Sequence, residues 1–170
     1  MNVAKIDRGD HAPEQVNVIV EIPQGSSIKY ELDKDSGALV VDRFLHTAMA
    51  YPFNYGFIPH THAEDGDPVD VLMLSSFPVA PGSVIMARPI GLLQMEDEAG
   101  RDDKIIAVPL VKIDPHYADV EDIDDLGTAT KNKIKHFFET YKELEPGKWV
   151  KTTGFMNKEN AMENIRMAFR

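Results

Sequence analysis

The chain has 170 residues, and 18 Lys and Arg against 28 Asp and Glu leave a net charge of −10. This length predicts a single domain spanning residues 1–170, and an apolar fraction of 43% excludes a disordered chain. No apolar run approaches the ~18 residues of a membrane span, and no stretch near the start has the pattern of a secretory signal. We therefore expect a cytoplasmic protein without a membrane partner.

Two further properties of the composition exclude classes of function. The chain has no cysteine, so disulfides, thiolate metal sites and cysteine nucleophiles are absent. The acidic charge argues against a general nucleic-acid binder, which needs a basic surface, and it suits a protein that collects cations.

The first two thirds of the chain are predicted to form short strands. In residues 16–22 and 28–33, apolar and polar side chains alternate with the period of two that is typical of half-buried strands. A turn at Asp33–Gly37 separates the second of these from the next strand and indicates a hairpin. Further strands are expected at 39–44, Val69–Leu74, Ser83–Met95 and Lys104–Ile113.

The helical pattern comes late. A helix is predicted from Lys131 to Leu144, with Thr128 or Thr130 as its cap and Glu145-Pro146-Gly147 at its end. Its apolar face carries Ile134, Phe137, Phe138 and Tyr141, and a second helix is expected from Asn157 onward. Many short strands with few helices and no βα alternation predict a mainly β fold with flanking helices, of the α+β kind, built on a small barrel.

The most informative local motif is Asp65-Gly66-Asp67-Pro68-Val69-Asp70, which holds three carboxylates within six residues. Gly66 permits a tight turn, and Asp70 enters an apolar strand. Such a turn can direct several oxygen ligands at one point, as Mg²⁺ and Mn²⁺ require. The alternative is a solvated acidic turn.

Two other acidic segments surround predicted turns. The first, Glu96–Asp103 before Lys104, is either a solvated hairpin tip or the second half of a multi-metal site with the Asp65–Asp70 turn. The second, Asp119–Asp125, precedes the main helix. There we expect negative charge to stabilise a helix N-terminus by a few tenths of a kcal/mol and to have no part in the site.

Cationic and phenolic side chains could bind an anion, although each alone could equally be a surface charge or a core residue. Lys34, in the predicted turn, is expected to lie outside any site, and His60 and His62 to lie in an exposed loop without zinc-ligand spacing. The candidates are Lys29, Arg43, Tyr51, Tyr55, Lys104, Tyr141 and Lys142.

An ordered set of motifs resembles the family I soluble inorganic pyrophosphatases, in their bacterial form. Asp65-Gly-Asp-Pro-Val-Asp-Val71 is similar to the family signature, and the resemblance runs from about Val16 to Trp149, with little signal beyond Lys151. Thr140 stands where many relatives have His, at a position linked to subunit contacts. The other motifs are Glu21-Ile-Pro, Ile28-Lys-Tyr-Glu31, Val41-Asp-Arg-Phe44, Tyr51-Pro-x-Asn-Tyr-Gly56, Asp97-Glu-Ala-Gly-x-Asp-x-Lys104, His136-Phe-Phe-Glu-x-Tyr-Lys142 and Gly147-Lys-Trp-Val150.

The resemblance implies an OB-like five-stranded barrel and Mg²⁺-dependent hydrolysis of pyrophosphate to two phosphates by a metal-activated water. It implies several Mg²⁺ ions per site, with Mn²⁺ or Zn²⁺ as substitutes, and a homohexamer. By position, Asp67 would be the general base, and Glu21, Glu31 and Asp103 would be outer-shell at most. The metal ligands would be Asp65, Asp70, Asp97 and Asp102, and the phosphate-binding residues Lys29, Arg43, Tyr55, Lys104, Tyr141 and Lys142.

Elementary chemistry favours the same arrangement. Pyrophosphate is a multiply charged anion, so cations must neutralise it before a water can attack.

Two alternative functions remain at this stage. An OB-like barrel could bind nucleic acid, which the net charge of −10 opposes. A catalytically inactive cation-binding module would keep the acidic turns and lose Lys29, Arg43 or Tyr55, all of which are present.

Overall fold

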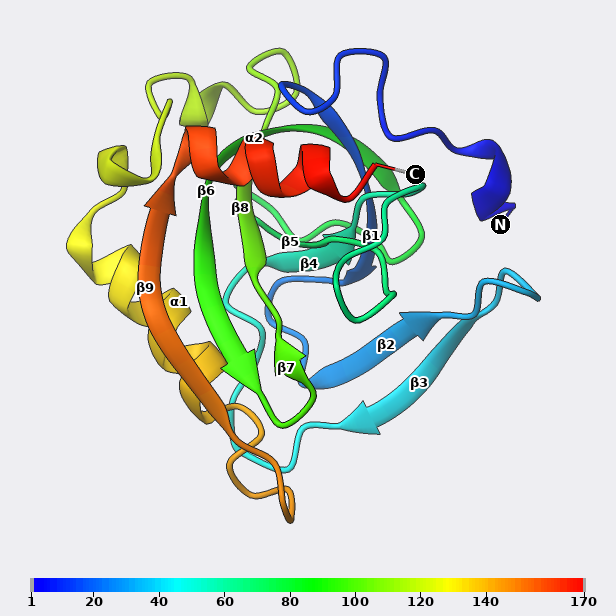
Figure 1. The fold of residues 1–170 in the computed structure, drawn as a ribbon, viewed down its shortest axis with the longest axis vertical. Helices are drawn as coiled ribbons and strands as arrows, with labels where there is room; N and C mark the ends of the chain where they lie inside the picture. The colour runs from blue at the N-terminus through cyan, green and yellow to red at the C-terminus, as the bar shows by residue number, and fades with distance from the viewer. Residues whose placement is uncertain (1, 170) are drawn as a thin grey trace.

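A computed structural model of the chain describes residues 2–169 (Figure 1). The strands are β1 Val16–Ile22, β2 Ile28–Leu32, β3 Leu39–Phe44, β4 Asn54–Phe57, β5 Asp70–Met73, β6 Val84–Asp97, β7 Gly100–Arg101, β8 Lys104–Pro109 and β9 Val150–Asn157. The α-helices are α1 Thr128–Thr140 and α2 Lys158–Met167, and the short 3-10 helices are η1 Val3–Lys5, η2 Pro115–Tyr117 and η3 Ile123–Asp125.

Five strands close a ring. The order is β1-β4-β5-β8-β6, and β6 pairs back with β1, so the sheet has no free edge at that point. All of these pairings are antiparallel except β5 with β8, which run parallel. The predicted OB-like five-stranded barrel in a mainly β fold is thereby confirmed.

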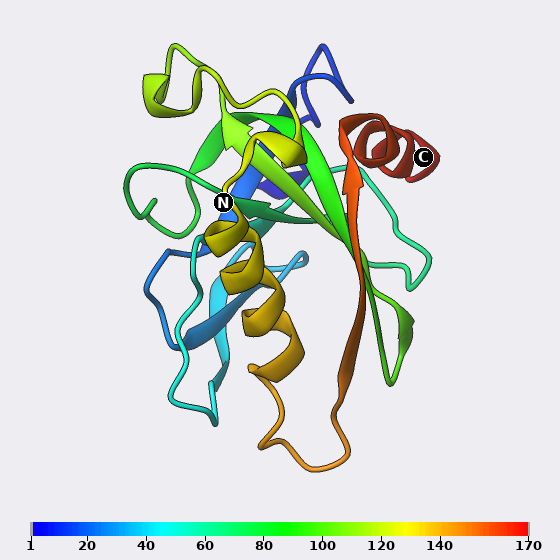
Figure 2. The same cartoon turned by 90° about the vertical axis from the view of Figure 1, so that its left-hand side faces the viewer.

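The remaining elements cover or extend the ring. β9 pairs with β6, β2 and β3 form the predicted hairpin outside the barrel, and α1 packs against β9 (Figures 1 and 2). α2 lies across β6. No helix in residues 2–169 is long and apolar enough to cross a membrane.

The ring strands are buried on both faces, which the alternation in residues 16–22 did not predict. Ile19 is as fully buried as Val18 and Val20. A register shift between Val20 and Ile22 turns Ile22 into the core beneath α1, whereas Val18 faces the core beneath α2. The strand is therefore a central one rather than the half-buried strand that was expected.

Three strands were missed: the two-residue β7, and β4 and β9, whose sequences lack strand patterns. β4 contains Asn54 and Gly56, and β9 contains Gly154, residues that are uncommon in strands. At Gly56 a Cβ would lie 2.0 Å from the carbonyl oxygen of Ile19, so only glycine permits β4 to approach β1 this closely.

Both predicted helices are present in the structure, but their bounds were predicted only approximately. α1 starts and ends earlier than predicted. Its N-cap is Gly127 without a side-chain cap, so the assignment of Thr128 or Thr130 as the cap was wrong. For α2, the Asn157 side chain accepts a hydrogen bond from the Asn160 N–H at 3.1 Å, as a polar N-cap does.

Candidate active site

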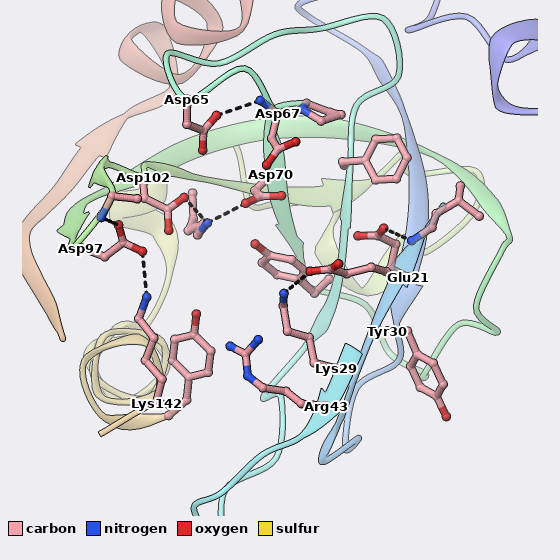
Figure 3. Close-up of a pocket in the computed structure, with 18 of the residues that line it drawn as sticks. Glu21, Lys29, Tyr30, Arg43, Asp65, Asp67, Asp70, Asp97, Asp102 and Lys142 are labelled. Atoms are coloured by element: carbon pink, nitrogen blue, oxygen red, sulfur yellow. Dashed lines mark hydrogen bonds and ion pairs between the residues drawn. The ribbon is translucent and has the colours of Figure 1, made fainter. Parts of the chain in front are cut away.

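A cavity of about 530 Å³ opens beside the barrel, between the β2–β3 hairpin, the loop before β5, the β6–β7 turn and the segment after α1 (Figure 3). Eight carboxylates and seven basic side chains line it. All eleven residues that the resemblance placed in a site are among the lining residues: Lys29, Arg43, Tyr55, Asp65, Asp67, Asp70, Asp97, Asp102, Lys104, Tyr141 and Lys142.

The acidic loop before β5 is a tight turn. The Asp67 N–H donates to Asp65 Oδ1 at 2.9 Å, and the Gly66 N–H donates to the Ala63 carbonyl at 3.0 Å. Gly66 has a φ of +91°, which glycine tolerates better than any other residue. Asp65 and Asp67 are exposed, while Asp70 begins β5 and is half-buried. The turn therefore presents its carboxylates toward the cavity (Figure 3).

The second acidic segment does approach this turn. The ammonium of Lys104 lies 2.6 Å from Asp70 Oδ2 and also contacts Asp102. Lys104 is 3% exposed, and burial alone would lower its pKa, but the charges of Asp70 and Asp102 outweigh burial and raise the pKa. Two carboxylates from different segments thus share one cation, which favours, of the two alternatives for the second segment, the one in which it adjoins the Asp65–Asp70 turn.

The pKa of Asp102 also reflects the negative charges that surround this residue. Burial raises the pKa of Asp102, contacts with Lys104 lower it, and the charges of Asp70 and Asp97 raise it further, with a net upward shift. An added cation would be stabilised in such surroundings. Within residues 2–169, however, no three acidic or histidine side chains already converge as a complete metal-ligand set.

Basic side chains form the opposite side of the cavity. Lys29 contacts Glu31 and lies 3.4 Å from Asp42, which also contacts Arg43. The Lys142 ammonium lies 2.7 Å from Asp97 Oδ2 (Figure 3). Each cation is therefore paired with an acid, and an anion entering the cavity would compete with those acids for the cations.

Tyr141 lies both in the core and at the cavity, the two positions considered for it from the sequence. Its ring stacks on Phe137 with centroids 5.0 Å apart, and the same residue lines the cavity. Burial, together with the charges of Asp102 and Asp70, outweighs the opposing charges of Lys104 and Arg43 and raises the pKa of Tyr141 to about 12. The hydroxyl is thus a hydrogen-bond donor at neutral pH.

Glu21, for which the resemblance implied an outer-shell position at most, is a half-buried acid at the cavity. Its side chain lines the cavity and accepts a hydrogen bond from the Leu32 N–H at 2.7 Å. Burial, helped by the charges of Asp70 and Glu31, raises the pKa of Glu21 to about 7. Glu31 also lines the cavity, whereas Asp103 accepts a hydrogen bond from the Met95 N–H and contacts Arg101.

Four charged lining residues were missed by sequence reasoning. Lys34 was expected to lie outside the site, but its ammonium is 3.2 Å from Asp67 Oδ1 because the β2–β3 turn reaches over the acidic loop. Glu98 and Lys148 pair at 2.6 Å, and Arg101 also lines the cavity. Glu98 and Lys148 stand within quoted motifs, so the resemblance could have pointed to them; Lys34 and Arg101 have no such signal.

The third acidic segment lies elsewhere, as predicted. Asp125 accepts hydrogen bonds from the N–H groups of Glu121 and Asp122, each at 2.9 Å, and Asp122 accepts one from the Lys158 N–H at 3.0 Å. These acids cap η3 and hold the start of α2 rather than the start of α1. His60 and His62 are exposed, as expected.

Known proteins match this chain along nearly its whole length. A family model described as inorganic pyrophosphatase matches residues 18–170, so the expectation of little family signal beyond Lys151 was wrong. The chain is 61% identical over 168 residues to an inorganic pyrophosphatase of Gluconobacter oxydans, covering 99% of this chain and 97% of that one. It is 60% identical over 164 residues to one of Aeropyrum pernix, covering 96% and 93% of the two chains.

Solved structures agree with the sequence matches. The structure of the inorganic pyrophosphatase from Helicobacter pylori aligns with a TM-score of 0.93 at 55% identity, and the alignment covers 96% of each chain. A match of this kind spans the barrel, the hairpin and both helices. The chain therefore belongs to the inorganic pyrophosphatase family and is a hydrolase.

Proposed function

We propose that the protein hydrolyses pyrophosphate to two phosphates in a Mg²⁺-dependent reaction within the cavity described above. The observation that carries the proposal is the meeting of eight carboxylates with seven basic side chains in one cavity. The negative charges of the carboxylates and the positive charges of the basic side chains nearly cancel. A bound pyrophosphate would therefore leave an excess of negative charge in the cavity. Divalent cations entering with the substrate would remove that excess.

The residues present fit such cations. Asp65, Asp70 and Asp102 would hold the activating ions, and Asp97 a further one. Support comes from the Lys104 ammonium, which Asp70 and Asp102 already share as a cation. Mg²⁺ is commonly held by one or two carboxylates together with water and substrate phosphates, so a complete protein ligand set is not required. Several ions per site are proposed, with Mn²⁺ or Zn²⁺ as substitutes.

When bound, the ions would neutralise phosphate oxygens and make water a stronger nucleophile near neutral pH. The protein's own cations and phenols would bind and orient the substrate: the ammonium and guanidinium groups would take the phosphate oxygens, and the two tyrosines would donate hydrogen bonds. These residues are Lys29, Arg43, Tyr55, Lys104, Tyr141 and Lys142, all of which line the cavity.

Asp67 would act as the general base. Its exposed carboxylate lines the cavity on a turn that contains Gly66 and Pro68, and its Oδ1 lies 3.2 Å from the Lys34 ammonium. A water attacks one phosphorus directly and its proton passes to Asp67. The bond from that phosphorus to the bridging oxygen breaks, and the second phosphate leaves.

The experiment is a phosphate-release assay with pyrophosphate and the purified chain. We expect two phosphates for each pyrophosphate consumed when Mg²⁺ is present, no release with EDTA, and recovery when excess Mg²⁺ is restored. Release that persists in EDTA, or no release with any divalent ion, would contradict the proposal.

A homohexamer is proposed on the resemblance, and a cytoplasmic location on the sequence pattern. The departure at Thr140 affects a position linked to subunit contacts. Here Thr140 donates a hydrogen bond to the His136 carbonyl at 2.6 Å, within its own helix. Light scattering after size-exclusion chromatography would give the mass, and a monomer of about 19.0 kDa would contradict the assembly.

A further inference from the structure

Arg43 is held from behind by a buried carboxylate that the proposed chemistry does not use. The Oε1 atom of Glu145 lies 3.0 Å from Arg43 Nε, and the Glu145 side chain is 8% exposed. Glu145 is not among the residues that line the cavity, whereas Arg43 is. The sequence indicated Glu145 only as part of a helix stop, so its position behind Arg43 needs another explanation.

Burial of this carboxylate is poorly compensated. Within residues 2–169, Glu145 Oε2 and Arg43 Nε are both buried and neither makes a hydrogen bond, so the two side chains are joined by an ion pair. A buried carboxylate without hydrogen bonds disfavours the folded state unless a charge partner offsets it. Arg43 is the one basic side chain in the described part of the chain that contacts Glu145. A residue kept for stability alone would be better satisfied, so the pairing points to a role for Arg43.

The contact with Glu145 occupies the Nε edge of the guanidinium and leaves its two terminal nitrogens to other partners. Glu145 meets the Nε edge, and Asp42 contacts Nη1. In Figure 3 the guanidinium lies between Lys29 and Lys142, with its terminal nitrogens directed into the cavity. That terminal fork is the part of arginine that binds phosphate oxygens in pairs.

The backbone around Glu145 connects it to two more cavity residues. Its N–H donates to the Lys142 carbonyl at 3.0 Å, and its carbonyl accepts from the Lys148 N–H at 3.2 Å. Lys142 and Lys148 both line the cavity. Glu145 therefore joins Arg43, on β3, to the segment after α1 that carries these two lysines.

We infer that Glu145 is a positioning residue: it fixes the guanidinium of Arg43 so that its terminal fork faces the phosphate groups of the substrate. The inference rests on the proposed hydrolysis of pyrophosphate and on Arg43 as a phosphate-binding residue. Glu145 itself touches no reacting atom. Its loss should therefore act through Arg43 and weaken substrate binding more than it slows turnover.

The test is a double-mutant cycle of Glu145→Gln and Arg43→Ala, measured as kcat and KM for pyrophosphate at saturating Mg²⁺. Glu145→Gln keeps the size of the side chain and removes its charge. In the wild-type background we expect KM to rise on the order of 10-fold, equivalent to about 1.4 kcal/mol, with a smaller change in kcat. In the Arg43→Ala background the same substitution should change neither value.

Two further variants keep the result interpretable. Glu139→Gln changes a half-buried acid on α1 that lies outside the cavity and should match the wild type. Glu145→Asp keeps the charge but withdraws the carboxylate, and it replaces Glu145→Gln if thermal unfolding shows that the latter does not fold. Its KM should also rise, again only when Arg43 is present.

Several outcomes would overturn the inference. A wild-type KM in Glu145→Gln would do so, and so would equal losses with and without Arg43, which would mean a purely structural role. A lower KM would mean that Glu145 competes with the substrate for Arg43. A wild-type rate in Arg43→Ala would remove the role of Arg43 and this inference with it, whereas an inactive wild-type protein would instead refute the proposed function on which both depend.

Discussion

Lys104 and Asp70 lie in contact at 2.6 Å although 34 positions separate them in the chain. Each is the first residue of its strand, and these strands, β8 and β5, pair in parallel with Val71 opposite Ile105. The one parallel pairing in the ring therefore brings the ends of two acidic segments together. Asp102, two residues before Lys104, completes the contact.

This relationship predicts non-additive effects at Asp70 and Asp102. Asp70→Ala and Asp102→Ala each remove a carboxylate from one shared cation site, so each should depress the maximal rate. The double variant should be little worse than the more impaired single variant, because either loss already disrupts the site. The measurement is kcat at saturating Mg²⁺ for the three variants, and strictly multiplicative losses would indicate two independent sites.

Asp122→Ala is the matched control for these acids. Asp122 lies in an equally acidic segment, but its carboxylate accepts hydrogen bonds from the N–H groups of Lys158 and Asp124. The variant should keep the rate and its Mg²⁺ dependence and lose on the order of 1 kcal/mol of unfolding free energy, the usual effect of losing a capping side chain. This exceeds the few tenths expected from the sequence alone.

Asp67→Asn should lower kcat by roughly 10²–10⁴, the usual contribution of general acid–base catalysis. The amide keeps the size of the side chain but cannot take a proton. The Mg²⁺ concentration that gives half-maximal rate should change less than kcat does. Lys133→Ala, an exposed change on α1, is the control in place of Lys34, which contacts Asp67. A near-wild-type kcat for Asp67→Asn would refute the assignment.

Arg43→Lys should be impaired although the charge is kept. A lysine cannot present the two-nitrogen fork that binds phosphate oxygens in pairs, nor meet Glu145 with a second edge. We expect kcat/KM to fall by roughly tenfold or more, the loss of one charge-assisted contact. Arg166→Lys, on the exposed side of α2, should leave kcat/KM unchanged. Equal values for both variants would make Arg43 a surface charge only.

Glu21→Gln should change how stability depends on pH in the metal-free protein. The pKa of folded Glu21 is raised from 4.5 to about 7, chiefly by burial. The folded state then binds this proton more tightly than the unfolded state, so the stabilising contribution is full below pH 4.5 and disappears as pH rises through about 7. The variant lacks this titration and should gain stability relative to the wild type between those pH values.

Urea unfolding in EDTA at pH 5 and pH 8 measures this effect. The difference in unfolding free energy between Glu21→Gln and the wild type should move in favour of the variant by on the order of 2 kcal/mol at the higher pH. Glu143→Gln, an exposed change after α1, is the control. The same difference at both pH values would mean that Glu21 is not the buried acid responsible.

An element of this fold could be predicted from the sequence where its apolar and polar residues follow the period of a strand or a helix. The β2–β3 hairpin was predicted from the alternation of apolar and polar residues in β2 and from the turn that follows it, although its burial does not alternate strictly. The face of α1 with Ile134 and Phe137 is buried, so its helical spacing could be read from the sequence. β4 is buried on all sides and contains Gly56, so its strand character depends on neighbouring strands. Ring closure through β1 and β6 is likewise a long-range pairing.

The residues of the candidate site also fall into those that the sequence could place and those that it could not. Residues within motifs, such as Asp67 and Lys104, could be placed by the resemblance because the order of the motifs is retained in this chain. Lys34 and Glu145 could not be placed, because each contacts a partner distant in the sequence. Their partners are Asp67, 33 positions from Lys34, and Arg43, on β3. Only the folded chain shows that the β2–β3 turn and the segment after α1 close around the cavity.

The most direct test of the account is a Mg²⁺ titration of the initial rate of phosphate release from pyrophosphate, for the wild type and Asp70→Ala in parallel. We predict no release without Mg²⁺, a rise to a maximum in the wild type, and for Asp70→Ala a curve displaced to higher Mg²⁺ with a lower maximum. A rate that does not depend on Mg²⁺, or two curves that coincide, would contradict the account.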